Sequence, residues 1–225
     1  METLADLLAG NASHAETFQD RFDDVQDGQS PAAVTVCCSD SRVLQDRAFD
    51  VAEPGAVFTC GNIGNRVVQE TDAGRAVSGD VLYPIAHAGT DLAVVVGHTG
   101  CGAVTATYDA ITQGLSDAPG IEHCVDLLRP GLEPAVDALP DDLDREAAIN
   151  RLVEHNVDRQ VAALRDSDAV PDSVTVAGVV YDFQDVYGGR RGAVHVVNVD
   201  GERDPEAIRE TAPSVADRVN RLWTY

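Results

Sequence analysis

Two short motifs that lie far apart in the chain carry side chains that transition metals prefer as ligands. The first runs from Cys38 to Arg42 and the second from His98 to Gly102. His98 and Cys101 are three residues apart, so one turn of backbone can aim both at one ion, whereas Cys38 precedes His98 by 60 residues (98 − 38). The fold itself must therefore close the site, which restricts the chain to architectures that place these two segments side by side.

The ligand chemistry of these motifs predicts a zinc ion. Thiolates and imidazole suit zinc better than hard cations such as magnesium, and catalytic zinc sites use three protein ligands and leave the fourth position open. We therefore expect Cys38, His98 and Cys101 to bind one Zn²⁺. Two alternatives stay open at this point, namely buried thiols beside a core histidine and a purely structural zinc site.

Asp40 and Arg42 follow Cys38 by two and four residues and make up a second functional unit. A carboxylate beside a zinc site can accept a hydrogen bond from the reacting water and so orient it. Arg42 would keep Asp40 ionised and fixed through charge-assisted hydrogen bonds. The alternatives are a turn aspartate with a surface ion pair, and Asp40 as the fourth zinc ligand.

Short β-branched runs that alternate with helical segments predict an α/β fold. The expected strands span 32–37, 56–60, 92–96, 174–181 and 193–199, and the clearest helices span 145–166 and 205–222. The last two strands flank a glycine turn and are expected to form an antiparallel hairpin. These elements predict a mostly parallel central sheet of about four strands plus an antiparallel edge strand, with helices packed on it. Both motifs follow strands, and ligand sites in such sheets gather beyond the carboxyl ends of the strands.

The other segments carry weaker patterns. Residues 71–88 are expected to be mostly helical, and residues 115–144 are expected to be loops with a short helix. We divide the chain into an N-terminal helical arm, residues 1–28, and a single α/β domain, residues 29–225.

The charge balance is the most unusual feature of the composition. The chain has 38 acidic and 16 basic residues, a net charge of −22, and every basic residue is arginine. Such a surface repels itself unless salt screens it, so we expect a salt-adapted cytoplasmic protein from an extreme halophile, with an ordinary acidic protein as the alternative. Acidity of this degree argues against nucleic acid and anionic membranes as partners. No signal segment or bilayer-spanning run is predicted, and the five cysteines are expected to be thiols or metal ligands.

The pattern C-x-D-x-R followed by H-x-x-C resembles the β-class carbonic anhydrases. The likeness runs from Gln29 to Gly102, with weaker echoes to about Asn198. It implies a zinc enzyme that reversibly hydrates carbon dioxide to bicarbonate and a proton, with the metal ligands and the Asp–Arg pair given above. The alternatives are a carbonyl sulfide or carbon disulfide hydrolase on the same fold, and a non-catalytic zinc-binding protein.

Further positions match the plant-like subtype of this family, in which the zinc site is open. The resemblance implies substrate-pocket roles for Gln29, Phe58, Ile63, Tyr83 and Gly102. It also implies a proton-transfer role for His87, four residues after the tyrosine. In the family the partner chain supplies the phenylalanine and the tyrosine, so a homodimer or a dimer of dimers is expected.

The chain departs from the family at two positions. Gly61 stands where members usually have arginine, and Thr35 stands where one subtype has tryptophan. In that subtype the arginine and the tryptophan hold bicarbonate at a regulatory site. We therefore expect the inhibitory bicarbonate site to be absent here.

Overall fold

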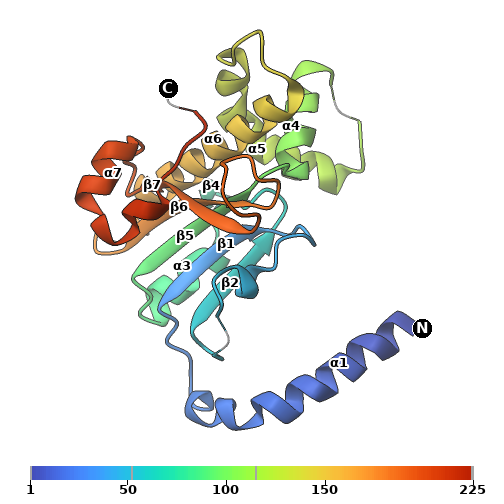
Figure 1. Cartoon of the computed structure of the whole chain (residues 1–225), viewed down its shortest axis with the longest axis vertical. Coiled ribbons are helices and arrows are strands. Elements are labelled where there is room, and N and C mark those ends of the chain that lie inside the picture. The colour runs from blue at the N-terminus through green and yellow to red at the C-terminus, as the bar shows by residue number, and fades with distance from the viewer. Residues whose placement is uncertain (1, 52, 115, 224–225) are drawn as a thin grey trace.

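The computed structural model describes residues 2–51, 53–114 and 116–223, and a five-stranded sheet lies at its centre (Figure 1). The strands are β1 Ala33–Cys38, β2 Val57–Asn62, β5 Leu92–His98, β6 Thr175–Asp182 and β7 Ala193–Val199, in the order β2-β1-β5-β6-β7. The first four strands in this order are parallel, and β7 pairs with β6 in the antiparallel sense. The prediction of a mostly parallel sheet with an antiparallel edge strand is confirmed.

The two central strands explain why the sheet forms here. β1 reads AVTVCC and is buried along its whole length, and β5 reads LAVVVGH and is almost as fully buried. Such β-branched and small residues suit a strand that is covered on both faces. Helices α3 Gly79–His87 and α6 Arg145–Arg165 pack on one face, while α7 Pro205–Thr211 and the 3₁₀ helix η2 Pro213–Arg218 pack on the other.

Helix α6 is the main support of the sheet. The Asp144 side chain caps it by accepting a hydrogen bond from the backbone N–H of Ala147 at 2.8 Å. The helix approaches β5 and β6 closely because both strands present glycine to Val157. A Cβ built on Gly97 or on Gly178 would lie 2.6 Å from a methyl group of that valine. Glycine is therefore required at both positions for the helix to sit at its observed depth.

Two predicted segments differ from the structure. Residues 71–88 do not form one helix, because a hairpin of β3 Val68–Thr71 and β4 Gly74–Val77 precedes α3. Gly74, with φ of +102°, makes the hairpin turn possible, and Ser78 caps the helix that follows. Local turn chemistry thus overrides the helical composition of this stretch.

Residues 115–144 also hold more helix than expected. Helix α5 Pro119–Asp137 follows α4 Gly102–Thr112, and both pack near α6. Pro130 and Pro134 lie inside α5, and they conceal its helical spacing of buried residues, which are Val125, Leu127, Leu128, Leu132 and Ala135. Burial of this apolar stripe outweighs the cost of two prolines.

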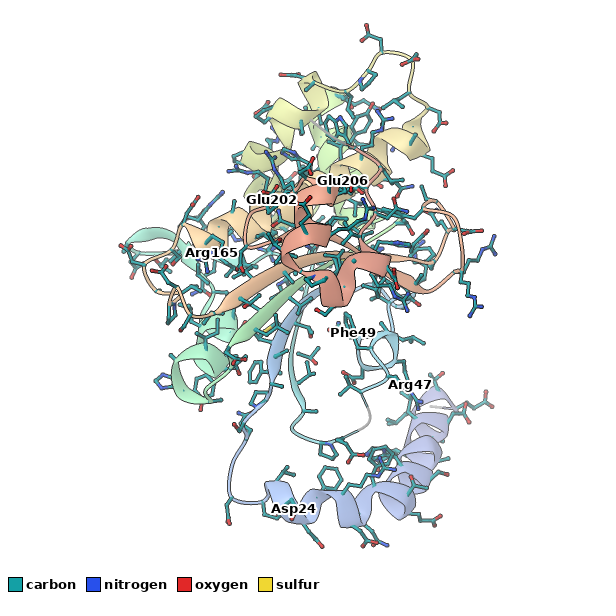
Figure 2. The ribbon with its side chains drawn as sticks, turned by 60° about the vertical axis from the view of Figure 1, so that its left-hand side comes forward. Asp24, Arg47, Phe49, Arg165, Glu202 and Glu206 are labelled. Carbon is teal, nitrogen blue, oxygen red and sulfur yellow. The ribbon has the colours of Figure 1, made fainter. Side chains whose placement is uncertain are left out.

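The N-terminal segment stands apart from the sheet. It comprises α1 Glu2–Phe18 and the 3₁₀ helix η1 Gln19–Val25, and neither contains a buried residue. Figure 2, in which Asp24 marks η1, shows the segment projecting away from the strands. Among the described residues no helix combines the length and the apolar character needed to cross a membrane.

Candidate metal centre

The two motifs meet at the carboxyl ends of β1 and β5, which are neighbours in the sheet (Figure 1). Cys38 is the last residue of β1, His98 is the last residue of β5, and Cys101 directly precedes α4. All three side chains are buried, and their potential ligand atoms lie within 4.8 Å of one another. The Sγ atoms of the two cysteines are 3.9 Å apart. The fold thus brings together the three residues that the sequence predicts as metal ligands.

The imidazole of His98 is held in one tautomer. Its Nδ1 lies 3.0 Å from the carbonyl oxygen of Thr99. Since a carbonyl oxygen only accepts hydrogen bonds, Nδ1 carries the proton and Nε2 keeps a lone pair. Nε2 is buried and has no hydrogen-bond partner within the described parts of the chain. A buried acceptor without a donor fits a metal cation.

The two thiols share one charge. Cys101 Sγ donates a hydrogen bond to Cys38 Sγ, and this contact lowers the pKa of Cys38 to about 5 even though burial raises it. The same contact, with burial, raises the pKa of Cys101 well above its usual range. The backbone N–H of Gly64 donates to Cys38 Sγ at 3.4 Å, and the first N–H groups of α4 favour the thiolate of Cys101. Ionisation of both cysteines at this distance would require a cation between them, so the donor set fits a metal ion.

Asp40 is clamped by Arg42 at the edge of this cluster. The guanidinium donates from Nε to Oδ1 at 2.9 Å and from a terminal nitrogen to Oδ2 at 2.7 Å. These hydrogen bonds hold the pKa of Asp40 well below its usual range. Arg42 also lies over the ring of Phe183, 4.6 Å from its centroid, and donates to the carbonyl of Gly100 at 3.1 Å. The carboxylate faces the metal ligands, because Oδ2 lies 3.7 Å from His98 Nε2.

The loop between His98 and Cys101 is tied to two other elements. Gly100 adopts φ of +59° and donates its N–H to the side-chain oxygen of Asn150 on α6 at 2.8 Å. Thr99 donates its N–H to the carbonyl of Tyr181 at 3.1 Å and its hydroxyl to Asp182 at 3.3 Å. The loop therefore has one fixed path, and the positions of both flanking ligands follow from it.

Sequence reasoning missed Asn150 and Asp182. Both are buried, at 2% and 1% exposure. Asp182 directly follows the predicted strand 174–181, so its place at a carboxyl end was a usable signal. Asn150 precedes Val153 and Val157 by three and seven residues, so a polar residue on the buried face of α6 was the signal there.

A family model described as carbonic anhydrase matches residues 33–189. The chain belongs to the carbonic anhydrase family. The carbonic anhydrase of Pseudomonas aeruginosa is 32% identical to it over an alignment of 162 residues, which covers 69% of this chain and 71% of that enzyme. Carbonic anhydrase 2 of Mycobacterium tuberculosis is 28% identical over an alignment of 187 residues, which covers 80% of this chain and 83% of that enzyme.

Solved structures place this carbonic anhydrase in the β class. The β-carbonic anhydrase CafA of Aspergillus fumigatus is 26% identical, with a TM-score of 0.69 over 95% of this chain and 96% of that one. The β-carbonic anhydrase CcaA shares the fold, with a TM-score of 0.72, 20% identity, and coverage of 88% of this chain and 89% of that one. The chain is therefore an enzyme that reversibly hydrates carbon dioxide.

Two of the pocket residues expected for a carbonic anhydrase lie beside the metal ligands. Gly102 follows Cys101 directly and begins α4. Ile63 follows Asn62, the residue of β2 that pairs with Cys38, and its side chain is exposed. Both residues therefore lie next to a residue of the Cys38, His98 and Cys101 cluster or to its strand partner.

The other expected pocket residues form a second group at a distance. Phe58 pairs with Val34, four residues back from the end of β2, which is about 13 Å at roughly 3.3 Å per residue. Its ring centroid lies 6.4 Å from that of Tyr83, which lies 5.2 Å from that of His87. Gln29 is exposed and precedes β1, at the opposite end of that strand from the cluster. A single chain does not bring these four residues to its own metal centre.

Gly61, which departs from the family pattern, has two side chains close to its Cα. Gly61 pairs with Cys37 across β1 and β2. A Cβ on Gly61 would lie 3.2 Å from Gln45 Nε2 and 3.2 Å from Ser39 Oγ. A larger residue here would therefore need both side chains to shift by a few tenths of an ångström.

Proposed function

We propose that Cys38, His98 and Cys101 bind a zinc ion and leave its fourth position open for catalysis. The observation that carries this proposal is the bidentate pairing of Asp40 with Arg42, since both carboxylate oxygens are already engaged. Zinc, when bound, would supply the Lewis acid that acidifies water, chemistry for which carbonic anhydrase is itself the standard example.

The residues around the ion have distinct roles in this proposal. Asp40 accepts a hydrogen bond from the attacking water and so directs its lone pair at the carbon of carbon dioxide. Arg42 keeps that carboxylate ionised and stationary, because it holds the pKa of Asp40 well below its usual range. Gly102 presents the N-terminus of α4, whose backbone N–H groups favour the anionic product.

The zinc assignment is tested with Cys101→Ala. This variant should lose stoichiometric zinc as measured by elemental analysis of the dialysed protein. Cys37→Ala is a matched control, because Cys37 is also buried next to the site but packs on the opposite face of the sheet. One zinc per chain retained in Cys101→Ala would sink the assignment.

The open site is tested with Asp40→Asn and a structure. The variant should keep its zinc and lose most of its carbon dioxide hydration activity in stopped-flow assays. An amide is neutral and replaces one acceptor oxygen with an NH₂ donor, so it holds the water less well than the carboxylate. A zinc-loaded structure at about pH 7.5 with an Asp40 oxygen about 2.0–2.2 Å from the ion would contradict the open site.

We also propose that the pocket of the plant-like subtype is completed by a second copy of the chain. The group of Gln29, Phe58, Tyr83 and His87 lies away from its own metal centre, and its tyrosine is half exposed. In a dimer, this group of one subunit would line the metal site of the other subunit, where His87 would transfer protons. A solved chain with this fold, 21% identical and with a TM-score of 0.69, comes from a description of two tetrameric β-carbonic anhydrases of Sordaria macrospora.

The N-terminal arm supports the same assembly. Leu4, Leu7 and Leu8 recur at helical spacing on α1 and are each more than half exposed, so the arm has an apolar stripe to bury on a neighbour. Deletion of residues 1–26 should weaken assembly in light scattering and lower activity together. A fully active monomer at assay concentration would rule out a homodimer or a dimer of dimers.

Finally, we propose a salt-adapted enzyme of the cytoplasm. Its net charge is −22 without a single lysine, and acidic side chains such as Asp24, Glu202 and Glu206 lie on the surface (Figure 2). None of the five cysteines forms a disulfide, which suits a reducing compartment. Concentrated salt would screen the repulsion among the exposed carboxylates.

A further inference from the structure

Asn150 is a buried polar residue on the face of α6 that packs against the sheet, with 2% exposure. Its side-chain oxygen accepts the N–H of Gly100 at 2.8 Å. Because the partner is a backbone donor, the amide orientation is fixed, with oxygen toward the loop. The amide nitrogen is buried and has no hydrogen-bond partner within the residues that the structure describes.

Gly100 links Asn150 to the Asp40–Arg42 pair. It lies between His98 and Cys101, and its own carbonyl accepts a hydrogen bond from Arg42 at 3.1 Å. Arg42 in turn holds both oxygens of Asp40. One continuous chain of hydrogen bonds therefore runs from α6 through the metal-binding loop to the carboxylate.

The two ends of the Asn150 amide contribute differently. Its oxygen satisfies the backbone N–H of Gly100, whereas its buried nitrogen has no partner among the described residues and costs free energy. The contribution of this asparagine is therefore made through its oxygen, at Gly100.

We propose that Asn150 is a positioning residue for carbon dioxide hydration. By holding the N–H of Gly100, it sets the carbonyl that fixes Arg42, and thereby the direction of the Asp40 carboxylate. The inference rests on the roles proposed above for Asp40 and Arg42.

The primary test compares Asn150→Leu with Asn150→Asp in the zinc-loaded enzyme. Leucine removes the acceptor, and kcat/KM for hydration should fall about 10–100-fold, the usual effect of losing a partner that orients groups around a metal. Aspartate keeps an acceptor oxygen at the same place and should restore kcat/KM to within about fivefold of the native enzyme. Zinc content should stay at one per chain in both. If the leucine variant does not fold, Asn150→Ser replaces it, because a hydroxyl on the shorter side chain cannot reach Gly100.

Asn198→Leu is the matched control. The Asn198 side-chain oxygen also accepts a glycine N–H, that of Gly201, at 2.9 Å, but this glycine lies in the turn after β7. The control loses this hydrogen bond and also the buried one that its amide nitrogen donates to Asp158 at 2.7 Å, so it should lose more stability than Asn150→Leu. Its kcat/KM, measured below the unfolding temperature, should stay within about twofold of the native value.

A double-mutant cycle with Arg42→Leu separates positioning from general support. If Asn150 acts through Arg42, Asn150→Leu should have little further effect on kcat/KM once Arg42 is gone. A spectroscopic readout independent of activity is the Arg42 Nε–H resonance, which should be protected from exchange in the native enzyme and in Asn150→Asp and lose that protection in Asn150→Leu.

The outcomes are distinguishable. Three results would overturn the inference about Asn150 but leave the proposed function standing. They are an equal loss of kcat/KM from Asn150→Leu with and without Arg42, an unchanged kcat/KM in Asn150→Leu, and an unchanged Arg42 resonance. Native activity in Arg42→Leu overturns the proposed function of the Asp40–Arg42 pair, and the inference with it. A non-additive loss with the resonance change supports both.

Discussion

Val157 should make alanine destabilising at two glycines of the sheet, with different consequences for metal binding. A Cβ on Gly97 would lie 2.6 Å from one methyl of Val157 and 3.1 Å from a methyl of Val153. A Cβ on Gly178 would lie 2.6 Å from the other methyl of Val157. Ordinary carbon contacts are about 3.5–4.0 Å, so each substitution creates an overlap of roughly 1 Å.

The expected cost follows from the rigidity of this layer. Every side chain in these contacts is buried between α6 and the sheet, so relief requires a shift of helix or strand. Overpacking of this kind costs about 1–3 kcal/mol. For a chain of this length each kcal/mol lowers Tm by about 2–4 °C, so Gly97→Ala and Gly178→Ala should each lower Tm by about 2–12 °C.

Of these two glycines, only Gly97 directly precedes a proposed metal ligand, His98. A strand shift at Gly97 should move that imidazole, so Gly97→Ala should lower metal affinity about tenfold or more. Gly178→Ala should keep metal affinity near the native value, because Gly178 lies on β6. Thermal unfolding by circular dichroism and competitive chelation measure the two quantities.

A third variant tests the physical cause. Val157→Ala removes both methyl groups that the new Cβ atoms would meet. Combined with Gly97→Ala, it should destabilise by at least about 1 kcal/mol less than the sum of the two single changes. Additivity to within about 0.5 kcal/mol would refute the reasoning that Val157 sets the depth of α6.

Three further predictions concern pH, salt and metal. Burial lowers the pKa of His195, so its contribution to stability is present above about pH 6.5, where the unfolded-state imidazole is neutral, and is lost as the pH falls toward the lower folded-state pKa. The Tm of His195→Phe should therefore fall less between pH 7.5 and pH 5 than the Tm of the native protein. An equal fall in both proteins would contradict this. Thermal unfolding in dilute buffer should occur many degrees below that in molar potassium chloride, and equal midpoints would refute salt adaptation. Chelation of the metal at neutral pH should lower Tm and expose two further thiols, Cys38 and Cys101, to a thiol reagent; an unchanged thiol count would argue against them as ligands.

The sequence was most informative where its pattern is local. The β-branched runs around Val36 and Val95 predict strands because they carry no turn or helix signal that points to another structure. The ends of these strands place the two motifs on one edge of the sheet. Helix α5 was missed because Pro130 and Pro134 mask its apolar stripe, which stabilises the helix only when neighbouring helices bury it. Asn150 could not be assigned, since its meaning depends on Gly100, 50 residues earlier (150 − 100).

The distance along the chain between the proposed metal ligands has a consequence for folding. An ion held by residues 38 and 98 closes a loop of 60 residues (98 − 38), as a cross-link would. In the chain-entropy view, closing such a loop removes about 4 kcal/mol of freedom from the unfolded chain. An ion that stays on the unfolded chain would keep β1 and β5 close before the sheet exists. Pairing of these parallel strands is a long-range contact and slow to form unaided. The metal-loaded chain should then refold faster than the stripped chain, so the centre that serves catalysis would also serve assembly of the fold.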